Sequence, residues 1–262
     1  MKYGFIGCGN MGGALARAVS CAEKSIMVSD FDARKAEQFA ASLGVTAADN
    51  ATVAKECDRI FLGVKPQMMQ DMLSGIKNEL QDKKPILISM AAGLKISQIQ
   101  NFAGGDLPVI RIMPNTPVSV GKGVVLYCAD GVKKDVLDDF ALDMRHCGIL
   151  DLIDESLIDA GCSVSGCGPA FMYMFANAVA KGGEQCGLSR GQAIKYAAAT
   201  MSGAAEMLMM SEKTPEELTD AVCSKGGSTI EGVNVLKNSD FESVVSNCIK
   251  AAFKRNLELG GK

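Results

Sequence analysis

The run from Ser224 to Thr229, Ser-Lys-Gly-Gly-Ser-Thr, has the residue types and spacing of a binding site for a small anion. Its two glycines let the backbone turn tightly and approach a ligand closely. The hydroxyl groups on either side, with the free N–H groups of a helix that begins there, supply hydrogen-bond donors without a fixed charge. We expect this run to bind a compact acid through Ser224, Gly226, Gly227, Ser228 and Thr229.

A second glycine-rich run, Gly7-x-Gly9-x-x-Gly12, lies between the first predicted strand and the first predicted helix. In a dinucleotide-binding fold, the first glycine makes a tight turn and the second lets the backbone approach the pyrophosphate. The third allows the helix to pack closely on the strand. Because strands and helices alternate in the sequence that follows, we predict that Gly7, Gly9 and Gly12 bind a dinucleotide cofactor.

Asp30 follows the second predicted strand, where an acidic residue usually accepts hydrogen bonds from the adenosine ribose and favours NAD. Arg34 and Lys35 lie close enough in the sequence to offset its charge. Asp30 and Asp32 are also suited to cap the helix that begins at Ala33. The sequence therefore predicts Asp30 as a cofactor contact but leaves the choice between NADPH and NADH open.

Three more turns follow predicted strands and should reach the same edge of the sheet, where ligands of open α/β sheets bind. They are Val64-Lys65-Pro66, Ala91-Ala92-Gly93 and the proline-flanked pair Asn115 and Thr116. Lys65 lies between an apolar strand and a helix-starting proline, which favours a ligand role over that of a solvated surface charge. Whether Asn115 touches the nicotinamide or holds its loop stays open. Our candidate cofactor contacts in these turns are Val64, Lys65, Pro66, Ala91, Gly93 and Asn115.

The composition is that of an ordinary globular protein: 48% hydrophobic and 22% charged residues in a chain of 262, with a net charge of −3. The charges are mixed along the chain and build no basic field for nucleic acid. No apolar run is long enough to span a membrane. The ten cysteines form no Cys-x-x-Cys pair, and the one histidine, His146, lacks partner ligands, so we expect no metal site. We interpret the cysteines as reduced core residues and expect a cytoplasmic protein.

Up to about residue 155, short β-branched runs alternate with helical patterns, which predicts a parallel sheet covered on both faces. The predicted strands are 3–6, 25–29, 59–64, 86–89, 109–113 and 123–128. The predicted helices are 11–21, 33–43, 50–56, 66–79, 96–102 and 132–145. Beyond residue 155 the strand signal disappears, and the predicted helices are 169–186, 189–210, 215–222, 229–236 and 242–257.

These patterns predict an α/β protein with an N-terminal Rossmann-type doubly wound sheet, residues 1–155, followed by an all-α C-terminal domain, residues 156–262. The stretch Ala170–Ala180 is apolar nearly all round, which predicts burial within a helical bundle or against a partner subunit.

Together these residues resemble the pyrroline-5-carboxylate reductase family, whose members make proline in the last step of its synthesis. The glycine-rich start of the chain is shared with many dehydrogenases, whereas the last two motifs, in this order and separation, are specific. The motifs that carry the resemblance run through the whole chain: Phe5–Gly12, Val64–Pro66, Met113–Pro117, Val164–Ala170 and Ser224–Ile230.

The resemblance implies reduction of the cyclic imine 1-pyrroline-5-carboxylate to L-proline by NADPH or NADH. It implies cofactor contacts from Asn10, Met11, Asn50, Lys65 and Pro66, beside the glycines. It implies substrate contacts from Glu212, Ser224, Ser228 and Thr229. It also implies a homodimer with interlocked helical domains and an active site formed between subunits, with dimers often assembled into larger rings. On this basis we expect Thr229 to hydrogen-bond the ring nitrogen of the imine as the catalytic residue.

The sequence departs from the family pattern at two positions. Lys225 stands where the family usually has a proline, which makes the loop less rigid and adds a charge near a carboxylate. Asp30 stands where the family more often has a small or basic residue, which puts the usual preference for NADPH in doubt.

Two alternative functions fit fewer residues. Reductases of 3-hydroxy acids share the two-domain plan but place a proton-relaying lysine where this chain has Met172, and an alcohol needs such a group more than an imine does. A protein that only senses the nucleotide would keep Gly7–Gly12 but would have no reason to keep the anion site at Ser224–Thr229.

Overall fold

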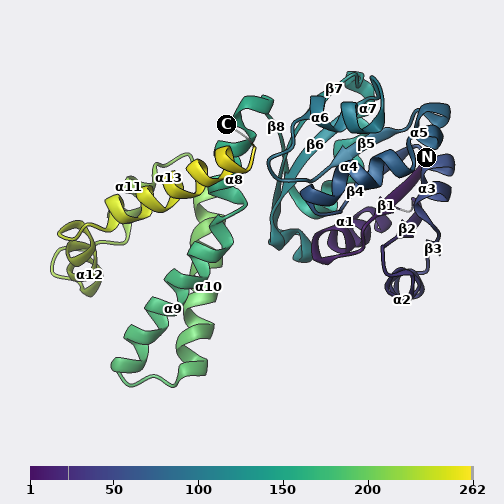
Figure 1. Ribbon diagram of the computed structural model, residues 1–262. Helices are drawn as coiled ribbons and strands as arrows, with labels where there is room; N and C mark the ends of the chain where they lie inside the picture. Colours follow the sequence, from purple (N-terminus) through teal and green to yellow (C-terminus); the bar gives the residue numbers. More distant parts are fainter. Residues whose placement is uncertain (23, 261–262) are drawn as a thin grey trace. The chain divides into compact units, whose positions relative to one another are not determined.

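Figure 1 shows the structure, a computed structural model that describes residues 1–22 and 24–260. The chain forms two compact units. One consists of Met1–Cys167 and the C-terminal stretch that begins at Ala252, and the other of Gly168–Ala251. These units are defined by contacts within the chain. They do not test the boundary between a nucleotide-binding and a substrate-binding domain after residue 155, which stays a prediction.

Within the described residues, the first unit is built on one sheet of eight strands in the order β3-β2-β1-β4-β5-β6-β7-β8. The strands are β1 Lys2–Ile6, β2 Ser25–Ser29, β3 Thr46–Ala47, β4 Arg59–Leu62, β5 Ile86–Ser89, β6 Val109–Pro114, β7 Gly123–Asp130 and β8 Gly148–Leu152. The short strands β3 and β8 are absent from the sequence prediction.

The sheet is not parallel throughout, in contrast to the prediction. Strands β1 to β6 are parallel, whereas β7 pairs antiparallel with β6 and β8 runs parallel to β7. The connection from β6 to β7 is the single short 3₁₀ turn η1, Thr116–Val120. Two parallel strands need a crossover connection of a dozen or more residues. Because the connection between β6 and β7 is much shorter, the chain reverses its direction there.

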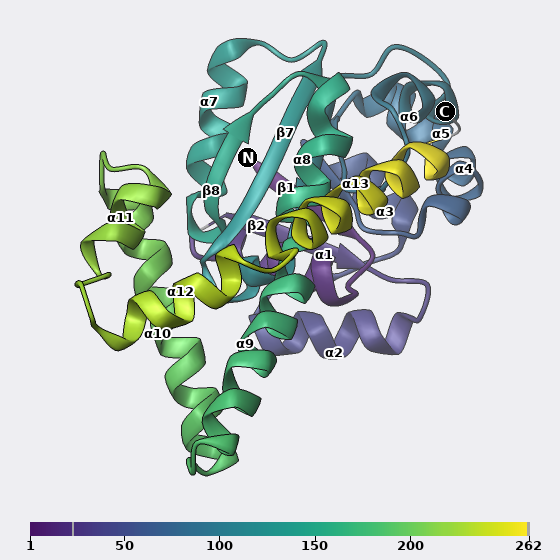
Figure 2. The same cartoon turned by 90° about the vertical axis from the view of Figure 1, so that its left-hand side faces the viewer.

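Helices cover both faces of the sheet, as predicted (Figure 2). The helices of this unit are α1 Asn10–Ser20, α2 Ala33–Leu43, α3 Asn50–Glu56, α4 Pro66–Gly75, α5 Lys77–Lys83, α6 Ile96–Ala103, α7 Lys134–Asp143 and α8 Ile158–Ser165. Two further 3₁₀ turns are η2 Arg145–Cys147 and η3 Glu155–Leu157. The helix predicted over 66–79 is broken between α4 and α5 after Gly75, a residue that weakens helices.

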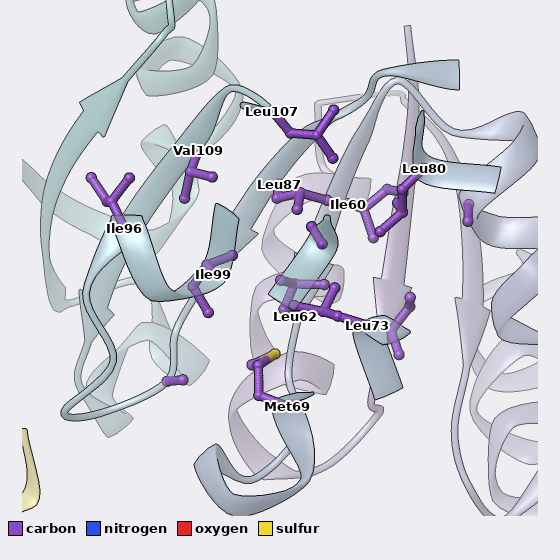
Figure 3. Close-up of a cluster of buried hydrophobic side chains, with 14 of the residues drawn as sticks. Ile60, Leu62, Met69, Leu73, Leu80, Leu87, Ile96, Ile99, Leu107 and Val109 are labelled. Carbon is purple, nitrogen blue, oxygen red and sulfur yellow. The ribbon is translucent and has the colours of Figure 1, made fainter. Parts of the chain in front are cut away.

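The alternation of side chains along β4 separates two hydrophobic cores. Ile60 and Leu62 face the core covered by α3 to α6 and α8, while Phe61 faces the core covered by α1, α2 and α7. Figure 3 shows the first core, where these two side chains lie among Met69 and Leu73 of α4. Each such buried side chain contributes about 1.5–3 kcal/mol to stability.

The second unit is entirely helical in the described residues, as predicted. Its helices are α9 Gly168–Gln185, α10 Arg190–Met210, α11 Pro215–Ala221, α12 Ser228–Lys237 and α13 Phe241–Leu259, the last of which continues into the first unit. Helices α9 and α10 form an antiparallel hairpin (Figure 1). The turn between them uses Gly187 at a positive φ of 99°, and the Ser189 hydroxyl then caps α10.

This helical unit leaves many of its apolar side chains exposed. Tyr173 and Met174 of α9 are 67% and 72% exposed, and Met210 of α10 is 88% exposed. The buried hydrophobic side chains of the described part of this unit are all alanines: Ala180, Ala193 and Ala197. Such apolar surface marks a contact with another protein surface, so of the two predicted ways to bury 170–180, a partner subunit fits this chain and its own bundle does not.

A buried polar cluster joins β1, β4 and α7 at the amino ends of the strands. The Tyr3 hydroxyl donates to Asp143 Oδ2 at 2.7 Å and accepts from the Arg59 guanidinium at 2.6 Å. Arg59 and Lys24 both form ion pairs with Asp143, with N···O distances of 3.4 and 3.1 Å. Burial is the main cause that raises the pKa of Tyr3 well above its usual value, so its hydroxyl keeps its proton and donates.

We predict that Tyr3→Phe lowers the free energy of unfolding by about 1–3 kcal/mol, because Asp143 and Arg59 each lose a buried partner. Urea denaturation at matched protein concentration measures this. Tyr127→Phe is the control, since the Tyr127 hydroxyl has no hydrogen-bond partner in the described part of the chain. Equal losses in the two variants would contradict a role for the cluster.

Candidate functional site

Two glycines bring neighbouring strand ends unusually close at the carboxyl edge of the sheet. The strand order changes direction between β1 and β4, and ligands of open α/β sheets bind outside such a switch point. Gly7 follows β1 with a φ of 104°, and a Cβ on it would lie 2.7 Å from the carbonyl oxygen of Gly63. A Cβ on Gly12 would overlap the carbonyl oxygen of Gly7, so α1 packs against this turn only because Gly12 lacks a side chain.

A cleft of about 390 Å³ opens at this switch point. It brings together predicted residues from three turns: Gly9, Asn10, Met11, Gly12, Val64, Lys65, Pro66 and Ala91. It is also lined by residues that the sequence analysis did not give as cofactor contacts: Gly63, Met90, Ala92, Met113 and Pro114. Each of these residues lies at the end of a strand or in the turn that follows it. Their position at the carboxyl edge of the sheet is the signal by which the sequence could have identified them.

The amino end of α1 faces this cleft without a side-chain cap. Gly9 is the N-cap residue, and no side chain in the described residues caps this end. A Cβ on Gly9 would meet no atom within 4 Å, so the glycine keeps free a space that a ligand can enter. The unpaired N–H groups and the partial positive charge of a helix start suit a pyrophosphate. The residues present therefore fit a dinucleotide.

Asp30 and Asn50 line a second cavity, which is bounded by α2, α3 and α4. Phe31 also lines it and is 97% exposed, an unusual setting for a phenylalanine. The capping role proposed for the two aspartates belongs to Asp32, which accepts from the backbone N–H groups of Arg34 and Lys35. The Asp30 carboxylate instead accepts from the Cys8 N–H at 2.8 Å, within the glycine-rich turn.

Two predicted cofactor contacts have other partners in the structure. Asn115 is 7% exposed, and its amide donates to the Ser165 carbonyl and accepts from the Val124 N–H, both at 2.9 Å. Of the two interpretations left open, holding the loop is the one that these bonds support. Gly93, with φ 79°, packs against the Leu259 carbonyl, 2.7 Å from where its Cβ would be. The residues that line the cleft include neither of them.

The candidate anion site in the second unit is a tight turn that ends in α12. The Gly227 N–H donates to the Ser224 carbonyl at 3.0 Å, and Gly226 has a φ of 73°. A Cβ on Gly227 would lie 2.5 Å from the Ser224 hydroxyl oxygen. Gly227 is the N-cap of α12, and within the described residues no side chain caps this helix. Ser228 and Thr229 are exposed in its first turn, so its N–H groups and hydroxyls are available to an anion.

Glu212 is exposed in the connection between α10 and α11. In the part of the chain that the structure describes, no hydrogen bond or ion pair joins it to the turn at Ser224–Thr229. Its substrate contact therefore stays a prediction.

The ten cysteines differ in how deeply they are buried. All ten cysteines are free, and burial, followed by the nearby Asp30 charge, raises the pKa of Cys8 to about 11. The interpretation of the cysteines as core residues holds for Cys8, Cys57, Cys128 and Cys147 but is wrong for the exposed Cys21, Cys186 and Cys248. No cluster of three or more potential metal ligands occurs among the described residues, and no helix there is long and apolar enough to cross a membrane.

Comparison with known families finds matches along most of the chain. The family model described as pyrroline-5-carboxylate reductase dimerisation matches residues 155–259. The model described as NADP oxidoreductase, coenzyme F420-dependent, matches residues 2–93.

Individual relatives match over nearly the full length. The pyrroline-5-carboxylate reductase of Escherichia coli is 35% identical, covering 98% of this chain and 98% of its own. That of Aquifex aeolicus is 33% identical, covering 99% and 97%. A crystal structure of pyrroline carboxylate reductase from Plasmodium falciparum with NADP bound is 30% identical, with a TM-score of 0.88 over 99% of this chain and 98% of that one.

The glycine-rich turn yields a paired prediction. Gly9→Ala should fold normally, because its Cβ meets only open space, but should weaken NADH and NADPH binding about tenfold or more by crowding the pyrophosphate. Gly12→Ala should instead lower stability, because its Cβ overlaps the Gly7 carbonyl. Nucleotide titration and urea denaturation of both variants measure this. Normal nucleotide affinity in Gly9→Ala would contradict the binding of the pyrophosphate at this turn.

Proposed function

The chain belongs to the pyrroline-5-carboxylate reductase family, and we propose that the strand-end cleft and the turn at Ser224–Thr229 bind its two reactants. The protein is an NAD(P)H-dependent oxidoreductase that reduces 1-pyrroline-5-carboxylate to L-proline, the last step of proline biosynthesis. We assign nucleotide binding to residues 1–155, and substrate binding and dimerisation to residues 156–262.

The nucleotide is assigned to three groups of residues in the first unit. The uncapped start of α1 at Gly9, Asn10 and Met11 binds the pyrophosphate, as the open space at Gly9 supports. The cavity of Asp30 and Asn50 binds the adenosine. The turns after β4 and β5 lie in the same cleft and border the nicotinamide through Val64, Lys65, Pro66 and Ala91.

The observation that carries the substrate assignment is the glycine-led start of α12, which no side chain in the described residues caps, although side chains cap three comparable helices. Ser189 and Thr214 cap α10 and α11, and Asp49 caps α3. At α12 the cap is Gly227, and the hydroxyls of Ser224 and Ser228 flank it. These groups bind the substrate carboxylate in place of an internal cap.

The substrate is a cyclic imine whose carbon accepts a hydride readily once the ring nitrogen carries a proton. Bound NAD(P)H supplies that hydride and the two electrons with it. As the imine carbon takes up the hydride, the π pair of the C=N bond moves to the ring nitrogen, which keeps its proton and becomes a secondary amine. The carboxylate contacts orient the ring, and the Thr229 hydroxyl hydrogen-bonds the ring nitrogen, so catalysis here is chiefly a matter of position.

The residues on α9 disfavour the alternative of a 3-hydroxy-acid reductase. Met172 stands where those enzymes place a proton-relaying lysine, and a thioether cannot donate a proton to an alkoxide. An imine that already carries its proton needs no such group.

Homo-oligomerisation follows from the dimerisation region at 155–259. We propose in addition that the protein forms a homodimer and that these dimers assemble into larger rings. The helical unit of each chain exposes apolar side chains on several helices, which supports this proposal. The ten free thiols support a cytoplasmic location, which we also propose.

The test of function is oxidation of NADPH and NADH, followed by nicotinamide absorbance, with and without 1-pyrroline-5-carboxylate. We expect oxidation that depends on the imine, with proline as the product. A protein that binds nucleotide but shows no imine-dependent oxidation would be a sensor or a reductase of a related imine such as the six-membered one.

For Thr229 we predict that Thr229→Ala lowers kcat about tenfold and leaves residual activity, because one hydrogen bond to the ring nitrogen contributes about 1–1.5 kcal/mol. Thr219→Ala is the matched control, since that hydroxyl bonds only the Pro215 carbonyl of its own helix in the described residues. Steady-state kinetics of folded variants measure this. Complete loss of activity in a folded variant, or no loss of activity at all, would contradict the role given to Thr229.

A further inference from the structure

The carboxylate of Asp30 is held by three donors at the end of β2. It accepts from the Cys8 N–H at 2.8 Å, from the Lys35 ammonium at 3.1 Å and from the Asp32 N–H at 3.2 Å. The Asp30 side chain is only 13% exposed, whereas that of Lys35 is 48% exposed. Asp30 is therefore a fixed group that takes its position from the glycine-rich turn.

This placement separates Asp30 from the helix-capping role. Asp32 caps α2, so nothing in the helix requires a carboxylate at Asp30. Asp30 also lines the cavity with Phe31 and Asn50, at the adenosine end of the cofactor site. An acidic group after the second strand, tied to the glycine-rich turn, is where the dinucleotide fold receives the ribose 2′-hydroxyl. One of its acceptor positions remains, since two oxygens with about four lone-pair sites receive three donors.

A third cavity, next to Asp30, is lined by two basic side chains. Arg17 and Lys35 line it together with Cys8, Gly9 and Asn10 of the glycine-rich turn. The Arg17 guanidinium lies over the Phe39 ring, 4.9 Å from its centre. This cavity shares Cys8 and Lys35 with the Asp30 cluster, so its two cationic side chains lie next to Asp30. With Lys35 paired to Asp30, much of its charge is already neutralised.

We propose that the Asp30–Lys35 pair selects NADH over NADPH. This inference rests on the nucleotide site proposed above. The carboxylate accepts a hydrogen bond from the 2′-hydroxyl of NADH and repels the 2′-phosphate of NADPH, and it holds the one ammonium in this cluster that would otherwise attract that phosphate. Removing the charge at Asp30 both relieves the repulsion and releases Lys35.

The charge state of Asp30 fits this role. Burial by itself raises the pKa of a carboxyl group, but the hydrogen bonds from Cys8, Lys35 and Asp32 outweigh it and leave the pKa of Asp30 below its usual value. Asp30 is thus an anion at physiological pH.

The experiment measures dissociation constants of the purified full-length protein for NADH and NADPH by nicotinamide fluorescence, without imine. The variants are Asp30→Ser, Asp30→Asn, Lys35→Gln and Asp30→Ser with Lys35→Gln. Asp30→Asn keeps an acceptor for the Cys8 N–H and guards against a folding defect. Asp32→Ser is the control: it removes a neighbouring carboxylate that caps α2 and does not face the glycine-rich turn.

The parent should bind NADH more tightly. Asp30→Ser and Asp30→Asn should shift the ratio of affinities toward NADPH by about 30- to 100-fold, since like charges held close cost several kcal/mol and each 1.4 kcal/mol is tenfold. Adding Lys35→Gln to Asp30→Ser should remove most of this gain. Asp32→Ser should leave the ratio unchanged. Adenosine 2′,5′-bisphosphate and ADP, titrated in the same way, should follow the same order.

A parent that binds NADPH more tightly than NADH, or an Asp30→Asn ratio within about threefold of the parent, would overturn the proposal. An equal shift in Asp32→Ser would do the same, since the effect would then be general surface charge. These outcomes are distinct from failure of the proposed function: binding of nucleotide without imine-dependent oxidation overturns the reaction alone, and absence of binding overturns both.

Discussion

The close approach of two backbone segments at Gly7 and Gly63 is the constraint on which the nucleotide-binding unit depends. The Gly7 N–H donates to the Ser29 carbonyl and the Gly63 N–H to the Ile6 carbonyl, both at 2.8 Å. The strand ladder therefore continues past the ends of β1 and β4 into the two turns. A side chain at Gly7 or Gly63 would collide with the other turn's backbone, and one at Gly12 would push α1 off the strand. This contact sets where α1 begins, and so where its uncapped N–H groups point.

Both candidate binding sites lie at the start of a helix that has a glycine N-cap and no side-chain cap in the described residues. At four helix starts a side chain supplies the acceptor: Asp32 at α2, Asp49 at α3, Ser189 at α10 and Thr214 at α11. At α1 and α12 the N-cap is glycine, and the acceptor must come from elsewhere. An oxygen from a capping side chain would occupy the place of a phosphate or carboxylate oxygen and compete with it. The glycine caps of α1 and α12 therefore leave room for such a ligand oxygen.

The sequence predicted those parts of the structure that depend on local patterns. Strands 25–29 and 86–89 and helices 33–43 and 50–56 match the observed bounds, because buried runs and capping residues mark them. The direction of β7 was missed, since it depends on the length and course of one loop. The engagement of Asn115 with Ser165 and that of Gly93 with Leu259 were also beyond reach. Both join residues far apart in the sequence, and no periodic pattern records such a pair.

The chemistry of the substrate explains why the helical unit leaves its stability to its partners. An imine with its proton in place needs orientation more than acid–base groups, and the orientation that we propose for Ser224, Ser228 and the backbone N–H groups requires that α12 is held rigidly. Yet the described part of this unit buries only small alanine side chains of its own, at 180, 193 and 197, while residues as large as Tyr173 and Met210 stay exposed. Contact with another subunit would remove the apolar area of these helices from water and fix them in place. With the substrate assignment proposed above, order in the anion site and association of subunits draw on the same free energy, so a change that weakens the association also weakens the proposed contacts with the substrate carboxylate.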